Sequence, residues 1–326
     1  MAPSHPSGLV QPLSVGNVVS AGLRLYANRF KQYFGVALVA TLWILLPFVL
    51  FIPGTILFVR LPEYSAFLGL LIPVWIGLLL LCSAKYSAGS SAIARLAFGE
   101  LTNQPETTKQ ASRFTDSRKW GFLLIGFLLS LIYGAIAFVF YIALIILFIA
   151  IFAVSEGSAF LQGDPEAFSQ AIDNNPASIL VISLLVLAIV IIGAVLFIWL
   201  AARFAIAEVP FAIEPETGST QSIGRGWELT SRNAWRVFLI LFIAFLLTIP
   251  LQIIVQVLSS VLNTILVTFV PSNSPSYMLL TIAASYILSF ASGVLIIPFW
   301  QSIKAVIYYD LRSRREGLGL ELHDRF

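Results

Sequence analysis

The amino-acid sequence predicts an all-α polytopic membrane protein with six transmembrane helices, and three observations lead to this fold class. Of the 326 residues, 59% are apolar and only 11% are charged, whereas a soluble domain usually carries about 25% charged residues. Long uncharged apolar runs recur along the chain. The positive charges are concentrated in alternate connections between these runs. The bilayer must therefore be the solvent for most of the chain.

Six apolar runs are each long enough to cross a hydrocarbon core of about 30 Å, which takes about 20 helical residues. They cover residues 34–59, 66–84, 120–155, 177–202, 237–270 and 277–303. Two runs are longer than one crossing requires. The third must tilt, project from the membrane or break near Gly134, and the fifth contains Pro250, which is expected to kink it or split it into half-helices.

The connections between the runs predict the orientation of the chain. Residues 1–33, the long connections after the second and fourth runs, and the C-terminal tail hold every Lys and Arg except Arg60. The positive-inside rule places these segments, and both termini, in the cytoplasm, which requires an even number of spans. No cleavable signal peptide is expected, because the first apolar run is too long for one. The single cysteine, Cys82, excludes an internal disulfide framework.

Similar short segments precede three of the runs. SVGNVVSAGLRLYANRFKQYF at 14–34 aligns with SIGRGWELTSRNAWRVF at 222–238, and ASRFTDSRKWGFL at 111–123 is a weaker copy. We expect three degenerate repeats, each a cytoplasmic amphipathic interfacial helix followed by a helical hairpin. The alternative is that Trp and Arg recur at membrane boundaries for unrelated reasons. The chain, 1–326, is then one membrane domain with a disordered tail at 1–12, repeats at 13–104, 105–210 and 211–310, and a cytoplasmic tail at 311–326.

The third of these segments has a basic face. Arg225, Arg232 and Arg236 share one side of the predicted helix, and Trp227 lies on the opposite side. We expect the helix to lie in the cytoplasmic headgroup layer, where each cation near an anionic surface contributes roughly 1 kcal/mol. The corresponding cations before the first run are Arg24 and Lys31. The predicted partners are membrane lipids, with other membrane proteins as further candidates and no nucleic acid.

Two stretches resemble a broad group of bacterial multi-pass proteins. The first is Pro210-Phe211 followed by SIGRGWELT at 222–230 and WRVF at 235–238, and the second is YYDLRSRREG at 308–317. The group includes the membrane domain of some glycerophosphoryl diester phosphodiesterases and the YciC-like inner-membrane proteins. The resemblance implies a six-span module of the bacterial plasma (inner) membrane and says little about activity.

An enzymatic function is not expected from this sequence. It contains no HExxH, GxSxG, P-loop or dinucleotide fingerprint, and the soluble catalytic barrel of the phosphodiesterases is missing. The two histidines, His5 and His323, lie in the tails. The acidic residues of the loop 154–177 fit no calcium-binding loop, and no metal or cofactor is predicted. These acidic residues are Glu156, Asp164, Glu166 and Asp173.

Uncharged polar residues form two stripes on the last two runs, and they mark a candidate cavity. The stripes consist of Gln252, Gln256, Ser259 and Asn263, and of Ser285, Ser289 and Ser292. They are explained either by interhelical hydrogen bonds, at about 0.6 kcal/mol per contact, or by a transport cavity beside a broken helix. The sequence thus favours a non-enzymatic membrane module that interacts with lipid or organises membrane proteins. The alternative is a transporter or permease for a neutral small molecule or lipid.

The predicted orientation is tested by cysteine labelling. A cysteine introduced at Ser274 is expected to react with an impermeant reagent added outside the cell, because Ser274 follows the fifth span. One introduced at Ser219 is expected to be protected. Labelling of position 219 from outside would overturn the orientation.

Overall fold

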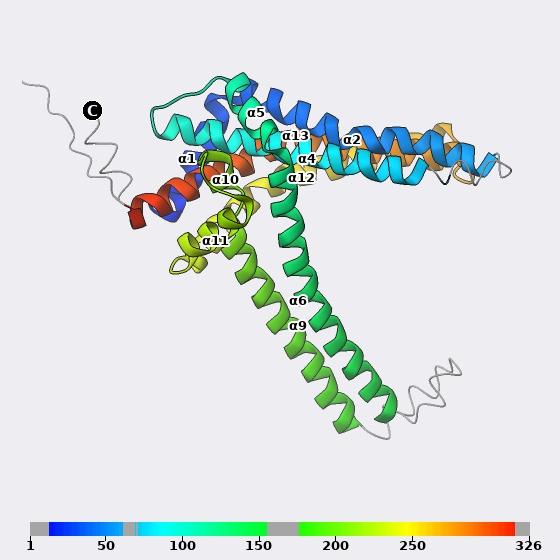
Figure 1. Cartoon of the computed structure of the whole chain (residues 1–326). Coiled ribbons are helices and arrows are strands. Elements are labelled where there is room, and N and C mark those ends of the chain that lie inside the picture. The colour runs from blue at the N-terminus through cyan, green and yellow to red at the C-terminus, as the bar shows by residue number, and fades with distance from the viewer. Residues whose placement is uncertain (1–12, 61–68, 70, 155–175, 317–326) are drawn as a thin grey trace, which may run out of the picture. The chain divides into compact units, whose positions relative to one another are not determined.

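The computed structural model describes residues 13–60, 69, 71–154 and 176–316. Within these residues all regular secondary structure is helical, which confirms the all-α fold class (Figure 1). The helices are α1 (Val15–Asn28), α2 (Phe30–Arg60), α4 (Leu71–Leu101), α5 (Thr108–Ser117), α6 (Lys119–Val154), α9 (Pro176–Phe204), α10 (Val209–Ile213), α11 (Ser219–Thr230), α12 (Ala234–Phe269) and α13 (Pro275–Glu316). The tail predicted at 1–12 lies outside the described residues.

Among the described helices, six are long and apolar enough to cross a membrane, and they correspond in order to the six predicted spans. The chain is therefore a multi-pass membrane protein. The third span, α6, is one continuous helix through Gly134. The fifth, α12, continues through Pro250 without dividing into half-helices, although proline removes one backbone donor from the helix.

Two of the spanning helices extend well beyond the apolar runs that predicted them. α4 has 31 residues and α13 has 42, which correspond to about 46 Å and about 63 Å at 1.5 Å per residue. A hydrocarbon core is only about 30 Å thick. The helices continue without a break past Lys85 and Lys304, where the sequence had placed the ends of the spans. Of the short helices, α4 contacts α5 and α10, and α13 contacts α1, α10 and α11.

A short helix precedes α2, α6 and α12, at the three places where similar segments occur in the sequence. Local capping explains where two of them begin. The Ser14 side chain accepts a hydrogen bond from the Asn17 backbone N–H (3.2 Å) at the start of α1. At the start of α5, Thr107 and Gln110 form a capping box. The repeat relationship among the three helices stays a prediction.

The chain divides into two compact units. The second unit, residues 126–201, contains parts of α6 and α9. The ring of Phe140 packs on Gly193, where an added Cβ would lie 3.2 Å from it. The rings of Tyr133 and Phe197 stack with their centroids 6.2 Å apart. Most large apolar side chains of this unit face outward, as expected where the surrounding solvent is lipid.

The first unit, residues 1–125 and 202–326, contains the main core. In it α2 packs on α4, α4 on α13, and α13 on α1 and α12. The largest fully buried side chains come from several of these helices and include Tyr33, Ile93, Ile303, Tyr308 and Leu311. The core therefore joins the beginning of the chain to its last helix.

The helix α11 packs its small and polar face against the end of α9 and the segment that follows it. The Ser222 hydroxyl donates to the Ala207 carbonyl (2.6 Å), and the Thr230 hydroxyl donates to the Arg203 carbonyl (3.0 Å). Between them, Gly226 has no side chain, and a Cβ there would lie 3.0 Å from the Ala207 Cα. The spacing of four residues places these three on one side of the helix, so glycine permits the close approach.

Two glycine substitutions on α11 are expected to change stability in opposite directions. Gly226→Ala should destabilise the protein by about 1–3 kcal/mol, because the new methyl group overpacks against backbone atoms. Gly224→Ala should stabilise it by about 0.5–1 kcal/mol, because a Cβ at Gly224 meets nothing within 4 Å. Thermal unfolding of both variants in the same detergent measures the difference. Equal melting temperatures for the two variants would contradict the packing of α11.

Candidate functional site

The predicted polar stripes contribute to a pocket of about 280 Å³ between α12 and α13. We call it the α12–α13 pocket. Four of the seven stripe residues line it, namely Gln256, Ser259, Asn263 and Ser285. The other three, Gln252, Ser289 and Ser292, are not among its lining residues. At one side Tyr277 donates its hydroxyl to the Asn263 side-chain oxygen (2.7 Å), so one direct interhelical hydrogen bond accompanies the open space.

The predicted lipid-facing cations are in two different environments. Arg24, Lys31 and Arg232 are exposed and form no ion pair with another described residue. Arg225 instead forms an ion pair with Glu214 (3.0 Å) and another with Glu316 (3.1 Å). Its guanidinium is thus occupied by contacts within the first unit.

Trp227, the predicted aromatic contact with lipid, is half-buried. Its ring lies 5.0 Å from the ring of Phe204, centroid to centroid. The Arg203 guanidinium lies over the Trp227 ring at 3.8 Å from its centroid, a cation–π geometry. The tryptophan therefore packs on the end of α9.

Arg236, the last of the predicted lipid-facing cations, binds the buried carboxylate of Asp310, whose side chain is only 3% exposed. Arg314, one turn after Asp310, binds the same carboxylate at 3.1 Å. Both arginines also donate to the backbone carbonyl of Leu13, and the Leu13 N–H donates to Asp310 (3.2 Å). This carboxylate joins the start of the described chain to α12 and α13.

Arg95, on the extension of α4, contacts three separate groups. It forms a bidentate ion pair with Glu106, with N–O distances of 2.6 and 2.8 Å. Its Nη1 donates to the carbonyl oxygens of Ala212 and Ile213 at 3.0 and 3.1 Å. Its guanidinium carbon lies 3.9 Å from the ring centroid of Phe114. Arg95 thereby connects α4 and α5 to the end of α10.

Arg118, between α5 and α6, binds the same end of α10. It donates to the carbonyl oxygens of Phe211 (2.8 Å) and Glu214 (2.9 Å), and also to that of Thr217. Its guanidinium lies 3.8 Å from the ring centroid of Phe211. No sequence motif marks Arg95 or Arg118 as functional, and the available signal is the isolation of Arg95 among small and apolar residues.

Glu214, just after α10, accepts hydrogen bonds from the hydroxyls of Thr217 (2.7 Å) and Tyr308 (2.5 Å). Arg225 and Arg312 lie at 3.0 and 3.7 Å from the same carboxylate. Burial raises the pKa of Glu214, but the two hydroxyl donors and the two arginines lower it further, so that the pKa lies below its ordinary value. The carboxylate therefore stays ionised in the folded protein.

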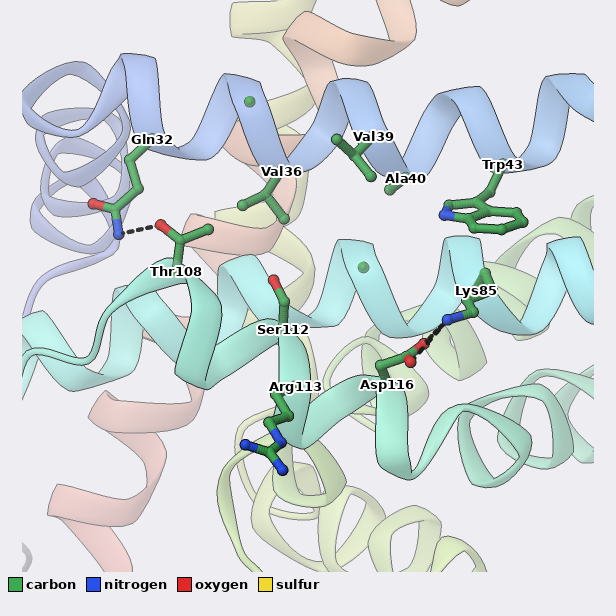
Figure 2. Close-up of a pocket in the computed structure, with 12 residues that line it drawn as sticks. Gln32, Val36, Val39, Ala40, Trp43, Lys85, Thr108, Ser112, Arg113 and Asp116 are labelled. Carbon is green, nitrogen blue, oxygen red and sulfur yellow. Dashed lines mark hydrogen bonds and ion pairs between the residues drawn. The ribbon is translucent and has the colours of Figure 1, made fainter.

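A second pocket, of about 420 Å³, lies among α2, α4 and α5, and we call it the α2–α5 pocket (Figure 2). The Gln32 amide donates to the Thr108 hydroxyl (2.9 Å) at one end. At the other end Lys85 and Asp116 form an ion pair of 2.6 Å. The pocket could not be predicted from the sequence, because its residues come from three separate segments.

No group of three or more His, Cys, Asp or Glu side chains in the described part of the chain is arranged to hold a metal ion. The acidic residues at 156, 164, 166 and 173 lie outside that part. That these acidic residues bind no metal therefore stays a prediction.

The environment of Glu214 predicts a pH dependence of stability. Because its pKa is lowered on folding, its contribution is present above the ordinary value of 4.5 and is lost as the pH falls through the lower folded value. Glu214→Gln should cost about 1–3 kcal/mol at neutral pH and should reduce the loss of stability below pH 4.5. The measurement is thermal unfolding between neutral and acidic pH. Glu216→Gln is the control, since Glu216 is exposed, and a change in its pH profile as large as that of Glu214→Gln would contradict the assignment.

The chain matches no protein-family model, no curated protein and no solved structure. The resemblance to the phosphodiesterase membrane domain and the YciC-like proteins therefore stays a prediction carried by the motif residues at 210–238 and 308–317.

Proposed function

We propose that this protein is a non-enzymatic membrane module that binds anionic lipid at its cytoplasmic face and thereby organises its surroundings in the bilayer. The observation that carries the proposal is a set of exposed cations on or directly after the three short helices that precede spans. The set consists of Arg24, Lys31, Lys109, Arg113 and Arg232. None of them forms an ion pair with another described residue.

The carboxylates of the first unit support this proposal, because most of them already have cationic partners. Asp116, Glu208, Glu214, Asp310 and Glu316 all form ion pairs within the unit. Internal pairing leaves the exposed charge near the short helices predominantly positive. A basic surface beside membrane-spanning helices attracts anionic headgroups, at about 1 kcal/mol for each cation near the bilayer.

The proposed location is the bacterial inner membrane with both termini in the cytoplasm. The charge distribution among the connections supports the orientation, and the resemblance stated above supports the bacterial membrane. The non-enzymatic part of the proposal is supported by the absence of catalytic fingerprints from the sequence. The proposed partners are membrane lipids, with other membrane proteins as further candidates.

Neutralising three of the exposed cations tests the proposal. The full chain carrying Arg24→Gln, Lys31→Gln and Arg232→Gln should lose most of its preference for anionic lipid, about 1 kcal/mol per cation. The measurement is the anionic fraction of the lipid that stays bound on extraction from nanodiscs containing equal amounts of anionic and zwitterionic lipid.

The control variant retains the charges as Arg24→Lys, Lys31→Arg and Arg232→Lys, and it should behave as the wild type does. Added salt should weaken the wild-type preference, because exposed charges are screened. Equal anionic fractions for the neutralised and charge-retaining variants would refute the lipid proposal.

The α12–α13 pocket favours a second candidate function, passage of a neutral small molecule or lipid. It is lined by uncharged polar side chains such as Gln256 and Asn263. The hydroxyl of Thr281, another lining residue, is buried without a hydrogen-bond partner among the described residues. Buried polar groups are usually satisfied by protein or by water, so this hydroxyl supports a pocket that holds a polar occupant.

A pair of glutamine substitutions separates the two functions. Gln256→Leu removes a polar side chain from the α12–α13 pocket, whereas Gln252→Leu makes the same change outside it. For a lipid-binding module we expect both to cost no more than about 1 kcal/mol and neither to alter solute permeability. The measurement is swelling of proteoliposomes in small neutral solutes. The transporter is favoured if the wild type makes the proteoliposomes permeable, Gln256→Leu abolishes this permeability and Gln252→Leu retains it.

A further inference from the structure

Two glycines line the α2–α5 pocket, and one of them, Gly35, leaves room for a ligand. A Cβ at Gly89 would lie 2.9 Å from the Ala40 Cβ, so Gly89 lets α4 approach α2 closely. A Cβ at Gly35 would meet nothing within 4 Å and faces open space. The volume of about 420 Å³ falls in the range of about 300–1,000 Å³ that is usual for small-molecule sites.

The polar wall of this pocket favours an anion with several acceptor oxygens. Lys85 is paired with Asp116 (2.6 Å), but an ammonium has three donors and retains capacity for a second acceptor. Ser112 and Thr108 add hydroxyl donors from α5, whereas the exposed Arg113 directs its guanidinium away from α2 (Figure 2). Figure 2 shows Ser112 and Thr108 directed toward α2. The remaining Lys85 donor and the two hydroxyls give a wall of hydrogen-bond donors, which suits a phosphate group.

The opposite wall of the pocket is apolar and continues into the surface of α2. Val36, Val39 and Trp43 line the pocket from α2. Val39 is 58% exposed, and Leu42 and Leu46 follow it on the same face at 54% and 37%. This continuous apolar strip leads from the polar wall along a membrane-spanning helix, so an acyl chain can follow it. A soluble phosphate compound would gain nothing from the strip.

From this combination we infer that the α2–α5 pocket binds a membrane phospholipid. The phosphate lies against Lys85, Thr108 and Ser112, and the first carbons of an acyl chain lie against Val39 and Trp43. The inference rests on the proposed lipid function and goes beyond it, because it assigns one defined site in place of a general electrostatic surface. The Trp43 ring lies 5.4 Å from the Lys85 ammonium, so the polar and the apolar wall meet at this residue.

Photocrosslinking of the full chain in phosphatidylcholine nanodiscs tests the site. The probe is phosphatidylglycerol with a photoreactive group close to the glycerol on one acyl chain, and crosslinked peptides are identified by mass spectrometry. We expect crosslinks within residues 30–46. Lys85→Gln should lower them about fivefold, whereas Asp116→Asn should raise them, because the competing carboxylate is removed. A decrease for Asp116→Asn would show that the ligand group is cationic and would overturn the inference.

Two glycine variants provide the steric test. Gly35→Leu should abolish the crosslinks by filling the pocket, while a leucine at this helical position is otherwise well tolerated. Gly77→Leu on α4 is the matched control, because a Cβ at Gly77 also meets nothing within 4 Å and Gly77 does not line the pocket. Equal melting temperatures establish that both variants fold. Undiminished crosslinks in Gly35→Leu would overturn the site.

The source of the phosphate is tested separately. A diacylglycerol probe without phosphate should not crosslink to residues 30–46, and inorganic phosphate at matched ionic strength should not displace the lipid probe. Equal crosslinking by diacylglycerol, or displacement by inorganic phosphate, would overturn the phospholipid assignment. If crosslinks at 30–46 are absent but neutralisation of Arg24, Lys31 and Arg232 still removes the preference for anionic lipid, the site is wrong and the proposed function stands. If crosslinks at 30–46 are absent and the neutralised variant keeps its preference for anionic lipid, both the site and the proposed function are rejected.

Discussion

The end of α10 needs hydrogen-bond donors from elsewhere in the chain, and the arrangement of the first unit depends on how they are supplied. The last carbonyl groups of a helix have no intrahelical partner, and α10 is only five residues long with a buried Phe211 and Ala212. Each buried polar group left unsatisfied would cost about 1–3 kcal/mol. Arg95 and Arg118 satisfy several of these carbonyls together, because a guanidinium carries five donors in one plane. Since the two arginines come from different places in the chain, α10 is connected to α4 and to the start of α6.

The need of buried polar groups for partners also explains the surface charge. A partly buried carboxylate is stable only with charged or hydroxyl donors around it. Glu214 therefore binds arginines of α11 and α13, and Asp310 binds Arg236 of α12 and Arg314 of its own helix. Once these pairs form, the exposed cations near the short helices outnumber the exposed carboxylates that have no ion pair among the described residues, Glu216 and Glu228. Most acidic residues of the unit therefore form internal ion pairs. As a consequence, the exposed charge of the short helices is mainly basic.

The two pockets differ in the physical means that create them. The α12–α13 pocket lies between helices whose facing residues are uncharged and polar, and Tyr277 bridges to Asn263 beside it. The α2–α5 pocket depends on a missing side chain at Gly35 and on polar contacts at both ends, from Gln32 to Thr108 and from Lys85 to Asp116. The first suits a small neutral occupant. The second combines charge with an apolar wall and suits an amphiphile.

The sequence alone determined the properties that depend on neighbouring residues. Hydrophobic length predicts each span, and caps such as Ser14 and Thr107 begin the short helices, because both effects act within a few residues. Only the tertiary structure decided which face of α11 is buried, since the choice depends on the close contact of Gly226 with Ala207. It also decided that Arg225 and Arg236 bind carboxylates of the protein, although their spacing favoured the lipid surface. Arg225 meets Glu316, which is 91 residues away, and pairing over such distances follows from helix packing that no local pattern encodes.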